Sequence, residues 1–183
     1  PSQSSAASDV YKRQALSKAV AADEQKNEDL LSLANTRARL RMVTLYYYAA
    51  CKRYLVAGTG NKVEDFGVGF YTKYGDGGVD LSPIADLSKT QVRALASTLG
   101  VDQKILNAPP TDGLWDDGRN DEEQLDATYE QLEWAMTQHA AGKSPADFVG
   151  ENARVFEVFL SHHNANKHKM DPIPVCSIPK QLL

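Results

Sequence analysis

The chain has 183 residues, 42% of them hydrophobic and 24% charged, with a formal net charge of -4. This length fits one globular domain, and the acidic balance argues against a nucleic-acid partner bound through phosphate neutralisation. No apolar run is long enough to cross a bilayer and no signal-peptide pattern is visible, so we expect a cytoplasmic protein without a membrane partner.

The first segment, residues 1–14, is small, polar and without a hydrophobic period, which predicts a disordered terminus. Its letters DVYKRQ resemble translated sequencing adaptor, so a non-native origin is a hypothesis for this segment. Residues 15–183 are expected to form one unit. From about Glu24 to Lys52 apolar residues recur at helical spacing, and we expect two helices interrupted at Asn35.

Residues 54–59, YLVAGT, form a short apolar run ending beyond a glycine, which predicts a strand buried on both faces of a parallel sheet. A lone strand has no ladder partners, so either the partners come from a missing N-terminal portion or the class is different. The glycine-rich stretch from Gly58 to Ser82 has no helix or strand period. A structureless connection of this length in a compact domain is usually functional or disordered.

The sequence SKTQ predicts a helix start, because the Ser88 hydroxyl can accept a hydrogen bond from the Gln91 amide. Gly100 should end this helix in the left-handed conformation. Four apolar side chains should be buried along it: Val92, Leu95, Ala96 and Leu99.

A second capping box, TYEQ at residues 128–131, predicts that residues 121–141 form two helices that meet near Ala127 and end at Gly142. A last helix is expected over residues 151–163. The proline-punctuated segment after Asp171 should be extended.

The residue types alone nominate several binding groups in the glycine-rich stretch. GTGNKVED follows the predicted strand, where ligands of open α/β sheets bind, so Thr59 offers a hydroxyl and Glu64 a hard oxygen for magnesium. In TKYGDGGVD, Lys73 is suited to a phosphate and Asp80 to sugar hydroxyls. The alternatives are a tight turn with a solvated glutamate and a plain glycine-rich surface turn.

Lys89 follows the helix N-cap, where the dipole favours an anion and opposes a lysine. A phosphate bound at the helix start would explain it, and a solvated lysine is the alternative. Thr111 follows two prolines in a stiff loop and offers a hydroxyl or an amide.

Two basic clusters lie on the first and last helices. His168 and Lys169 lie at the end of the last helix, where cations complement the dipole even without a ligand. Arg39 and Arg41 are two residues apart on a helix, so at most one should point into a site.

Taken together, the segments RARLRM, GTGNKVE, GFYTKYGDGGVDLSPIADLSKTQVRALASTLG, PPT and HKM resemble the NAD synthetase family and occur in its order, from about Leu31 to Pro174. The resemblance implies an α/β, Rossmann-like adenine nucleotide alpha-hydrolase (ATP pyrophosphatase) fold, here truncated and mostly helical. It also implies a C–N ligase that makes NAD+ from deamido-NAD, ATP and ammonia. ATP adenylates the nicotinate carboxylate and releases pyrophosphate, and ammonia then displaces AMP.

Carried over position by position, the resemblance implies that Thr59, Lys89 and Thr111 contact ATP and that Glu64 binds Mg2+. No residue is assigned as catalytic. The family's second substrate lies across a two-fold interface that includes the helices around RMVTLYYYAACKRYL, so a homodimer is expected. Five residues would contact deamido-NAD: Arg39, Lys73, Asp80, His168 and Lys169.

Two departures from the family pattern matter. The pyrophosphate-binding motif SGGxDS has no counterpart in the sequence, so we expect a C-terminal portion that is inactive alone. The spacing between Glu64 and Lys73 is one residue longer than in some members, which makes Asp65 the substitute metal ligand.

Three matters stay open at this level. The nitrogen donor is ammonia or glutamine. A non-catalytic nucleotide-binding or dimerisation module derived from an ATP pyrophosphatase is the alternative function. GMP synthetase, of the same superfamily, is disfavoured because KYGDGG is not part of its pattern.

Overall fold

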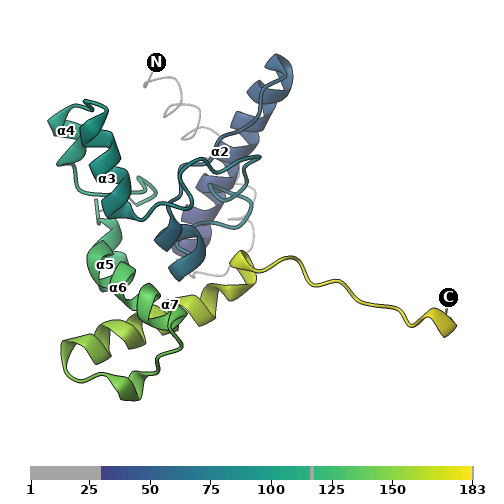
Figure 1. Ribbon diagram of the computed structural model, residues 1–183. Helices are drawn as coiled ribbons and strands as arrows, with labels where there is room; N and C mark the ends of the chain where they lie inside the picture. The colour runs from purple at the N-terminus through teal and green to yellow at the C-terminus, as the bar shows by residue number, and fades with distance from the viewer. Residues whose placement is uncertain (1–29, 116–117, 183) are drawn as a thin grey trace.

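The computed structural model describes residues 30–115 and 118–182 (Figure 1). The segment 1–14, expected to be disordered, lies outside the described residues. The described elements run in this order: α2 Leu30–Lys52, η1 Val63–Val68, α3 Lys89–Thr98, α4 Gln103–Leu106, α5 Asp121–Leu125, α6 Tyr129–Ala140, η2 Pro145–Asp147, α7 Glu151–Met170 and η3 Lys180–Leu182.

The first described helix, α2, is continuous over 23 residues, so the expected interruption at Asn35 is wrong. The Asn35 side chain is engaged outside its own helix, because its Oδ1 accepts a hydrogen bond from the Thr72 hydroxyl at 2.6 Å. This bond ties the glycine-rich loop to α2.

The predicted strand at residues 54–59 is also wrong. The described part of the chain has one isolated parallel bridge here, between Ala57 and Leu81, in which the Gly58 amide donates to the Leu81 carbonyl at 2.7 Å. Tyr54 is 72% exposed and Leu55 68% exposed, which is the exposure expected of an apolar run without neighbouring strands.

The stretch from Gly58 to Ser82 is not structureless, because it contains the π-helical turn η1. A π turn takes up one residue more than an α turn. Gly69 closes the turn with a φ of 62°.

The second half of the chain begins its helices where the capping boxes predicted. Ser88 and Thr128 each accept a hydrogen bond from the amide three residues on, and both capping boxes are complete. Gly100 and Gly142 both have a φ of 74°, as expected of helix ends. Helix α7 runs to Met170, seven residues beyond the expected end, and an extended tail follows it.

The apolar stripe of α3 does not enter a core, which corrects the prediction that it is buried. No residue of this helix is buried among the described residues. Leu95 is 45% exposed and Leu99 is 73% exposed. Helix α3 packs against α4 and α6, and Val92 and Ala96 are only partly buried.

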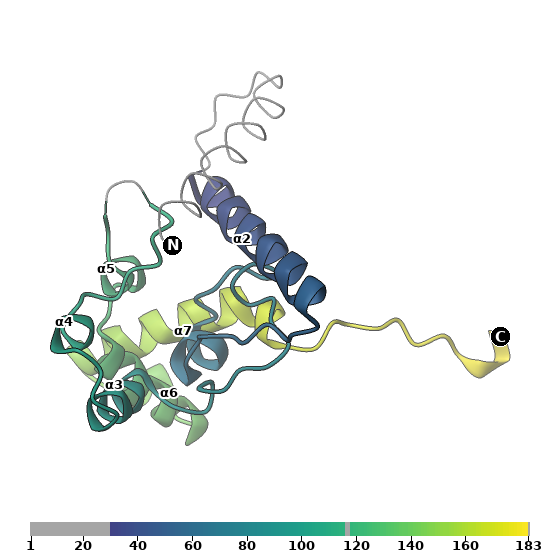
Figure 2. The same ribbon diagram turned by 90° about the horizontal axis from the view of Figure 1, so that it is seen from above.

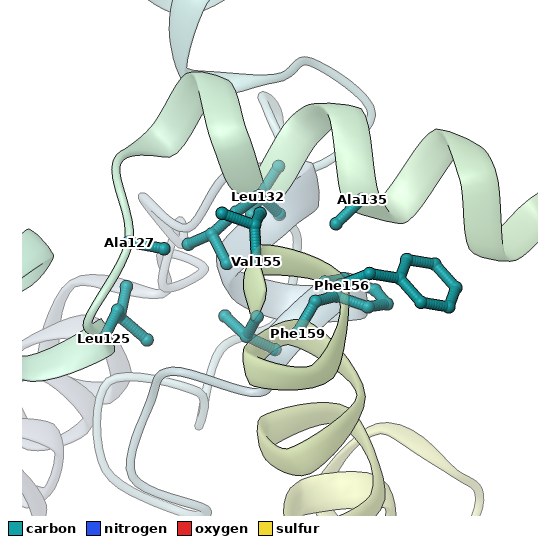
Figure 3. Close-up of a cluster of buried hydrophobic side chains, with 9 residues drawn as sticks. Leu125, Ala127, Leu132, Ala135, Val155, Phe156 and Phe159 are labelled. Atoms are coloured by element: carbon teal, nitrogen blue, oxygen red, sulfur yellow. The ribbon is translucent and has the colours of Figure 1, made fainter. Parts of the chain in front are cut away.

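The core lies where α6, α7 and η1 meet. Figure 3 shows Leu132 and Ala135 of α6 facing Phe156 and Phe159 of α7. Val63 and Val68 of η1 complete this cluster. The core therefore fixes η1, which carries Glu64, against two long helices.

Helix α2 lies on the other side of the glycine-rich loop, along one edge of the molecule (Figure 2). The loop is thus held between α2 and the end of α7, and the tail after α7 runs away from the body. Within the described residues no helix has the length and apolarity that crossing a membrane requires.

Candidate functional site

A cavity of about 440 Å³ is bordered by α2, the loop after residue 56, the start of α3 and the segment around residue 111. The four residues predicted to contact ATP or magnesium all line it: Thr59, Glu64, Lys89 and Thr111. They come from three separate stretches of the chain, so the fold brings together what the sequence places up to 52 positions apart.

The Glu64 carboxylate accepts several hydrogen bonds on the wall of this cavity. Lys89 Nζ donates to its Oε1 at 3.1 Å, and the Asn61 amide donates to its Oε2 at 3.1 Å. The Glu64 side chain is only 13% exposed and that of Lys89 23%, so this ion pair is partly removed from water. Partial burial strengthens the attraction between the two charges.

A buried tyrosine sits behind this pair. The Tyr129 hydroxyl donates to Glu64 Oε1 at 2.5 Å and also lies 3.2 Å from Asp121 Oδ2. Burial and the neighbouring carboxylate of Glu64 raise the pKa of Tyr129, so the phenol remains a donor. Lys89 Nζ lies 4.7 Å from the centre of the same ring, a cation–π contact.

Asp121, the first residue of α5, is 7% exposed and lines the cavity. Burial raises the pKa of its carboxyl, and the hydrogen bond from Tyr129 opposes that shift. Of its two oxygens, Oδ1 has no hydrogen-bond partner within the described part of the chain.

The start of α3 differs from the expected phosphate-binding helix terminus. The Thr90 amide and hydroxyl donate to the carboxylate of Glu133 on α6, at 3.0 and 2.6 Å. A protein carboxylate therefore already occupies this place. Lys89 turns its ammonium toward Glu64 and the cavity instead.

A second cavity, of about 260 Å³, shares Thr59 and Glu64 with the first. Asp65, Asp76 and Lys169 also line it. Burial, together with the carboxylates of Glu64 and Asp76, raises the pKa of Asp65 to about 6. Asp65, the substitute metal ligand in the sequence analysis, thus borders the second cavity, and Glu64 borders both.

Four of the five residues expected to contact deamido-NAD meet where the glycine-rich loop passes between α2 and the end of α7. Arg39 Nε donates to the Lys73 carbonyl at 3.2 Å, and Lys73 Nζ donates to the carbonyl of His168. Lys169 Nζ donates to the carbonyls of Gly69 and Tyr71, both at 2.8 Å. These bonds fasten the loop to both helices.

Asp80 lies apart from this group. Its carboxylate accepts hydrogen bonds from the Val56 amide at 2.8 Å and from the Tyr46 hydroxyl at 3.1 Å. It lines neither of the two cavities described above.

Two residues of this site were not singled out from the sequence: Asp121, which lines the larger cavity, and Tyr129, whose hydroxyl lies next to it. Of the two arginines considered on the first helix, Arg41 lines this cavity and Arg39 does not. Arg41 donates to the carbonyls of Asp112 and Gly113, on a different face of α2 from Arg39. Tyr129 follows a helix N-cap and reads as a core aromatic. Asp121 reads as an ordinary acidic residue in the first turn of a helix.

The residues present can be compared with what magnesium requires. Within the described ranges no group of three His, Cys, Asp or Glu side chains is arranged to hold a metal ion. Magnesium in nucleotide enzymes is commonly held by one or two carboxylates, with waters and substrate phosphates completing the shell. The Glu64 carboxylate on the cavity wall therefore fits a nucleotide-bound magnesium ion, whereas a cage made of protein alone does not fit.

Comparison with known proteins finds relatives that carry similar names. The family model described as NAD synthase matches residues 4–172. The NH(3)-dependent NAD(+) synthetase of Carboxydothermus hydrogenoformans is 47% identical over 119 residues, which are 65% of this chain and 48% of that protein. The one from Methanocaldococcus jannaschii is 40% identical over 151 residues, 80% of this chain and 58% of the relative.

Solved structures extend the likeness to three dimensions. NMN synthetase from Francisella tularensis matches with a TM-score of 0.69 and 34% identity, over 89% of this chain and 62% of that one. NH3-dependent NAD synthetase from Campylobacter jejuni has a TM-score of 0.66 at 23% identity, over 91% and 62%. The expected fold class is confirmed: the chain is a mostly helical part of the adenine nucleotide alpha-hydrolase fold. It spans about half the length of the curated relatives it matches.

Proposed function

This chain belongs to the NAD synthase family, whose members are ligases of NAD biosynthesis, and from that premise we propose that it serves the ATP-dependent amidation of deamido-NAD to NAD+. The observation that supports this most is the meeting of Thr59, Glu64, Lys89 and Thr111 around one cavity. Ammonia is the proposed nitrogen donor, since the relatives are named as NH(3)-dependent enzymes.

The reaction has two steps, and the first of them requires positive charge at this site. A nicotinate carboxylate oxygen attacks the α-phosphorus of ATP and pyrophosphate leaves; ammonia then attacks the acyl carbon, and AMP leaves as a proton is released. Negative charge develops on phosphate oxygens in the first step, and fixed cations stabilise it. Magnesium, when bound, supplies further positive charge at the phosphates.

Lys89 is placed to stabilise the negative charge that develops on the phosphate oxygens. Its ammonium is paired with Glu64 at 3.1 Å on the cavity wall. Binding of ATP offers that ammonium a phosphate as a new partner and leaves the Glu64 carboxylate for the metal ion. Thr59 and Thr111, both exposed in the cavity wall, supply polar groups to the nucleotide.

The deamido-NAD site is proposed along the loop that Arg39, Lys73, His168 and Lys169 hold. Lys169 lines the second cavity, which adjoins the first at Thr59 and Glu64. A dinucleotide lying along this path would bring its nicotinate carboxylate to the junction of the two cavities, next to ATP. We also retain Asp80 in this site, beside Val56, although it lines neither cavity.

The proposed protein is a cytoplasmic homodimer in which residues 15–183 form one unit. Its support is a face of α2 where three apolar side chains are more than half exposed: Val43, Tyr47 and Tyr48. Aromatic side chains are enriched in interface cores. The second substrate would then lie close to that interface.

Binding of ATP tests the proposed nucleotide site. We expect calorimetric titration of the purified chain with ATP and magnesium to show binding that Lys89→Ala weakens by about tenfold or more, since a charge-assisted contact to phosphate is lost. Lys104→Ala, an exposed lysine on α4, is the matched control and should bind as the wild type. Equal affinity of all three proteins, or no binding by the wild type, would contradict the assignment.

The second substrate has two candidates, because one structural neighbour is named as an NMN synthetase. Titration with deamido-NAD and with its mononucleotide counterpart separates them, with Lys73→Ala as the variant that should weaken the true ligand. Tighter binding of the mononucleotide would move the proposal to that substrate.

The 183 residues contain no SGGxDS motif, so we propose that the chain alone does not turn over. Assay with deamido-NAD, ATP, magnesium and ammonium should therefore give no NAD+, and clear NAD+ formation would contradict this. The remaining alternative is a non-catalytic module. The DNA upstream of Ala15 distinguishes it, because an in-frame SGGxDS supports the enzyme and a start codon with a promoter supports the module.

A further inference from the structure

One hydroxyl serves two carboxylates in the larger cavity. The Tyr129 phenol lies 2.5 Å from Glu64 and 3.2 Å from Asp121. A phenol has a single proton and can donate it to one acceptor at a time. The shorter distance assigns that proton to Glu64, so Asp121 has at best a weak share of it.

The negative charge of the buried Asp121 carboxylate is therefore poorly compensated. The residue is 7% exposed, and its buried Oδ1 has no hydrogen-bond partner in the described ranges. Buried carboxylate oxygens are nearly always hydrogen-bonded, paired or coordinated to a metal. Glu64, in contrast, has both the Lys89 ammonium and two hydrogen-bond donors.

A third carboxylate on the same wall, that of Asp112, differs from Asp121 because both of its oxygens have hydrogen-bond partners. Asp112 also lines the cavity, but its oxygens accept hydrogen bonds from the Leu114 amide at 2.8 Å and from the Trp115 indole at 3.2 Å. Both oxygens of Asp112 are thus occupied by the protein. Among the described residues of this wall, the acceptor that stays unsatisfied is Asp121 Oδ1.

We propose that Asp121 is a second carboxylate ligand of the divalent cation, which it shares with Glu64. This inference rests on the proposed role of Glu64 as a magnesium ligand. Two carboxylates joined through the same tyrosine, on the wall of one cavity, match the usual one or two protein ligands of magnesium in nucleotide sites. The open coordination positions are left for water and phosphate oxygens.

Manganese can probe this site directly, because the electron paramagnetic resonance signal of free Mn2+ reports binding without any turnover. The full chain would be titrated as wild type, Glu64→Gln, Asp121→Asn and the control Asp112→Asn. We expect Glu64→Gln and Asp121→Asn each to weaken Mn2+ binding by about tenfold or more, while Asp112→Asn stays within about twofold, because a lost metal ligand costs more than a lost neighbouring charge.

The outcomes separate this inference from the proposed function. Weakening by Glu64→Gln alone would overturn the role of Asp121 and leave that of Glu64 intact. If the wild type does not bind Mn2+, or neither variant weakens binding, the metal assignment of Glu64 fails and the inference falls with it.

A measurement on the wild type guards against a variant that does not fold. Carbon NMR of the side-chain carboxyl groups should show the Asp121 resonance broadened at lower Mn2+ concentration than that of Asp112. Equal broadening of the two resonances would overturn the proposal.

Discussion

Gly69 shows how one residue fixes the turn that carries Glu64. Its φ is 62°, and an added Cβ would lie 2.5 Å from Asn166 Cβ on α7. Gly69→Ala thus meets both an unfavourable backbone conformation and a collision, and we expect it to lower the free energy of unfolding by more than about 2 kcal/mol. Urea denaturation followed by circular dichroism measures this.

Gly113 provides the matched control for that variant. It has the same φ of 62°, but an added Cβ would meet nothing within 4 Å. Gly113→Ala should therefore cost only the backbone term, about 1 kcal/mol. Equal losses in the two variants would show that the collision with Asn166 is unimportant.

Asp65 makes stability depend on pH. Burial, then the charges of Glu64 and Asp76, raise its pKa to about 6 from its ordinary value of 3.8. A carboxyl whose pKa is higher in the folded state disfavours its own ionisation there, so the fold loses stability as the pH rises from the unfolded value to about 6. Above that the loss is complete.

Asp65→Asn removes this ionisation. We expect the variant to be more stable than the wild type by roughly 1 kcal/mol at pH 7.5, a value reduced for the partial exposure of the side chain, and equally stable below about pH 4. Urea midpoints across this range test it. Asp147→Asn should instead lower the stability at pH 7.5, because hydrogen bonds from Ser144 lower the pKa of Asp147 and so favour its ionised form in the fold. A gain that persists at low pH would contradict the account.

The residue types of the larger cavity could be predicted in part. Thr59, Glu64, Lys89 and Thr111 stand in segments whose order resembles a known family, and the structure brings them to one cavity. Tyr129 and Asp121 gave no such signal, because a tyrosine after an N-cap and an acid in a first turn have ordinary structural explanations. The contact of Tyr129 with Glu64 depends on the packing of α6 against η1, and that packing is not encoded in the spacing of the residues.

At the scale of elements, local signals proved reliable and non-local ones did not. The capping boxes at Ser88 and Thr128 depend on atoms within one turn, and both form as expected. The strand at residues 54–59 and the buried face of α3 depend on partners elsewhere, and both predictions were wrong. An apolar period shows that a face can be buried, but it does not show that a partner is present.

The contrast between two apolar helix faces can be measured. Phe159 on α7 is fully buried, whereas Leu99 just after α3 is 73% exposed. We expect Phe159→Ala to lower the free energy of unfolding by about 3–5 kcal/mol and Leu99→Ala to stay within about 0.5 kcal/mol. Chemical denaturation gives both values. A loss of several kcal/mol in Leu99→Ala would mean that the α3 face is covered in solution.

At the scale of the molecule, the two unpartnered apolar faces lie on separate elements. One is the α3 stripe, with Leu95 and Leu99, and the other is the face of α2, with Val43, Tyr47 and Tyr48. Figure 2 shows α2 along one edge of the body, away from α3. The α2 face is the more aromatic, and Tyr47 and Tyr48 contact each other edge to face at 5.4 Å between ring centres. Large amphipathic rings of this kind favour a protein interface.

The proposed homodimer therefore predicts unequal effects of charge on these two faces. Tyr48→Glu puts a carboxylate into the α2 face, and we expect it to weaken dimerisation by about 100-fold, since a charge would be buried without a partner. Leu99→Glu makes the same change on the α3 face and should leave the dimer intact. Sedimentation equilibrium over a range of concentrations distinguishes monomer from dimer for all three proteins. A wild type that stays monomeric, or a dimer that Leu99→Glu dissociates and Tyr48→Glu does not, would rule out α2 as the interface.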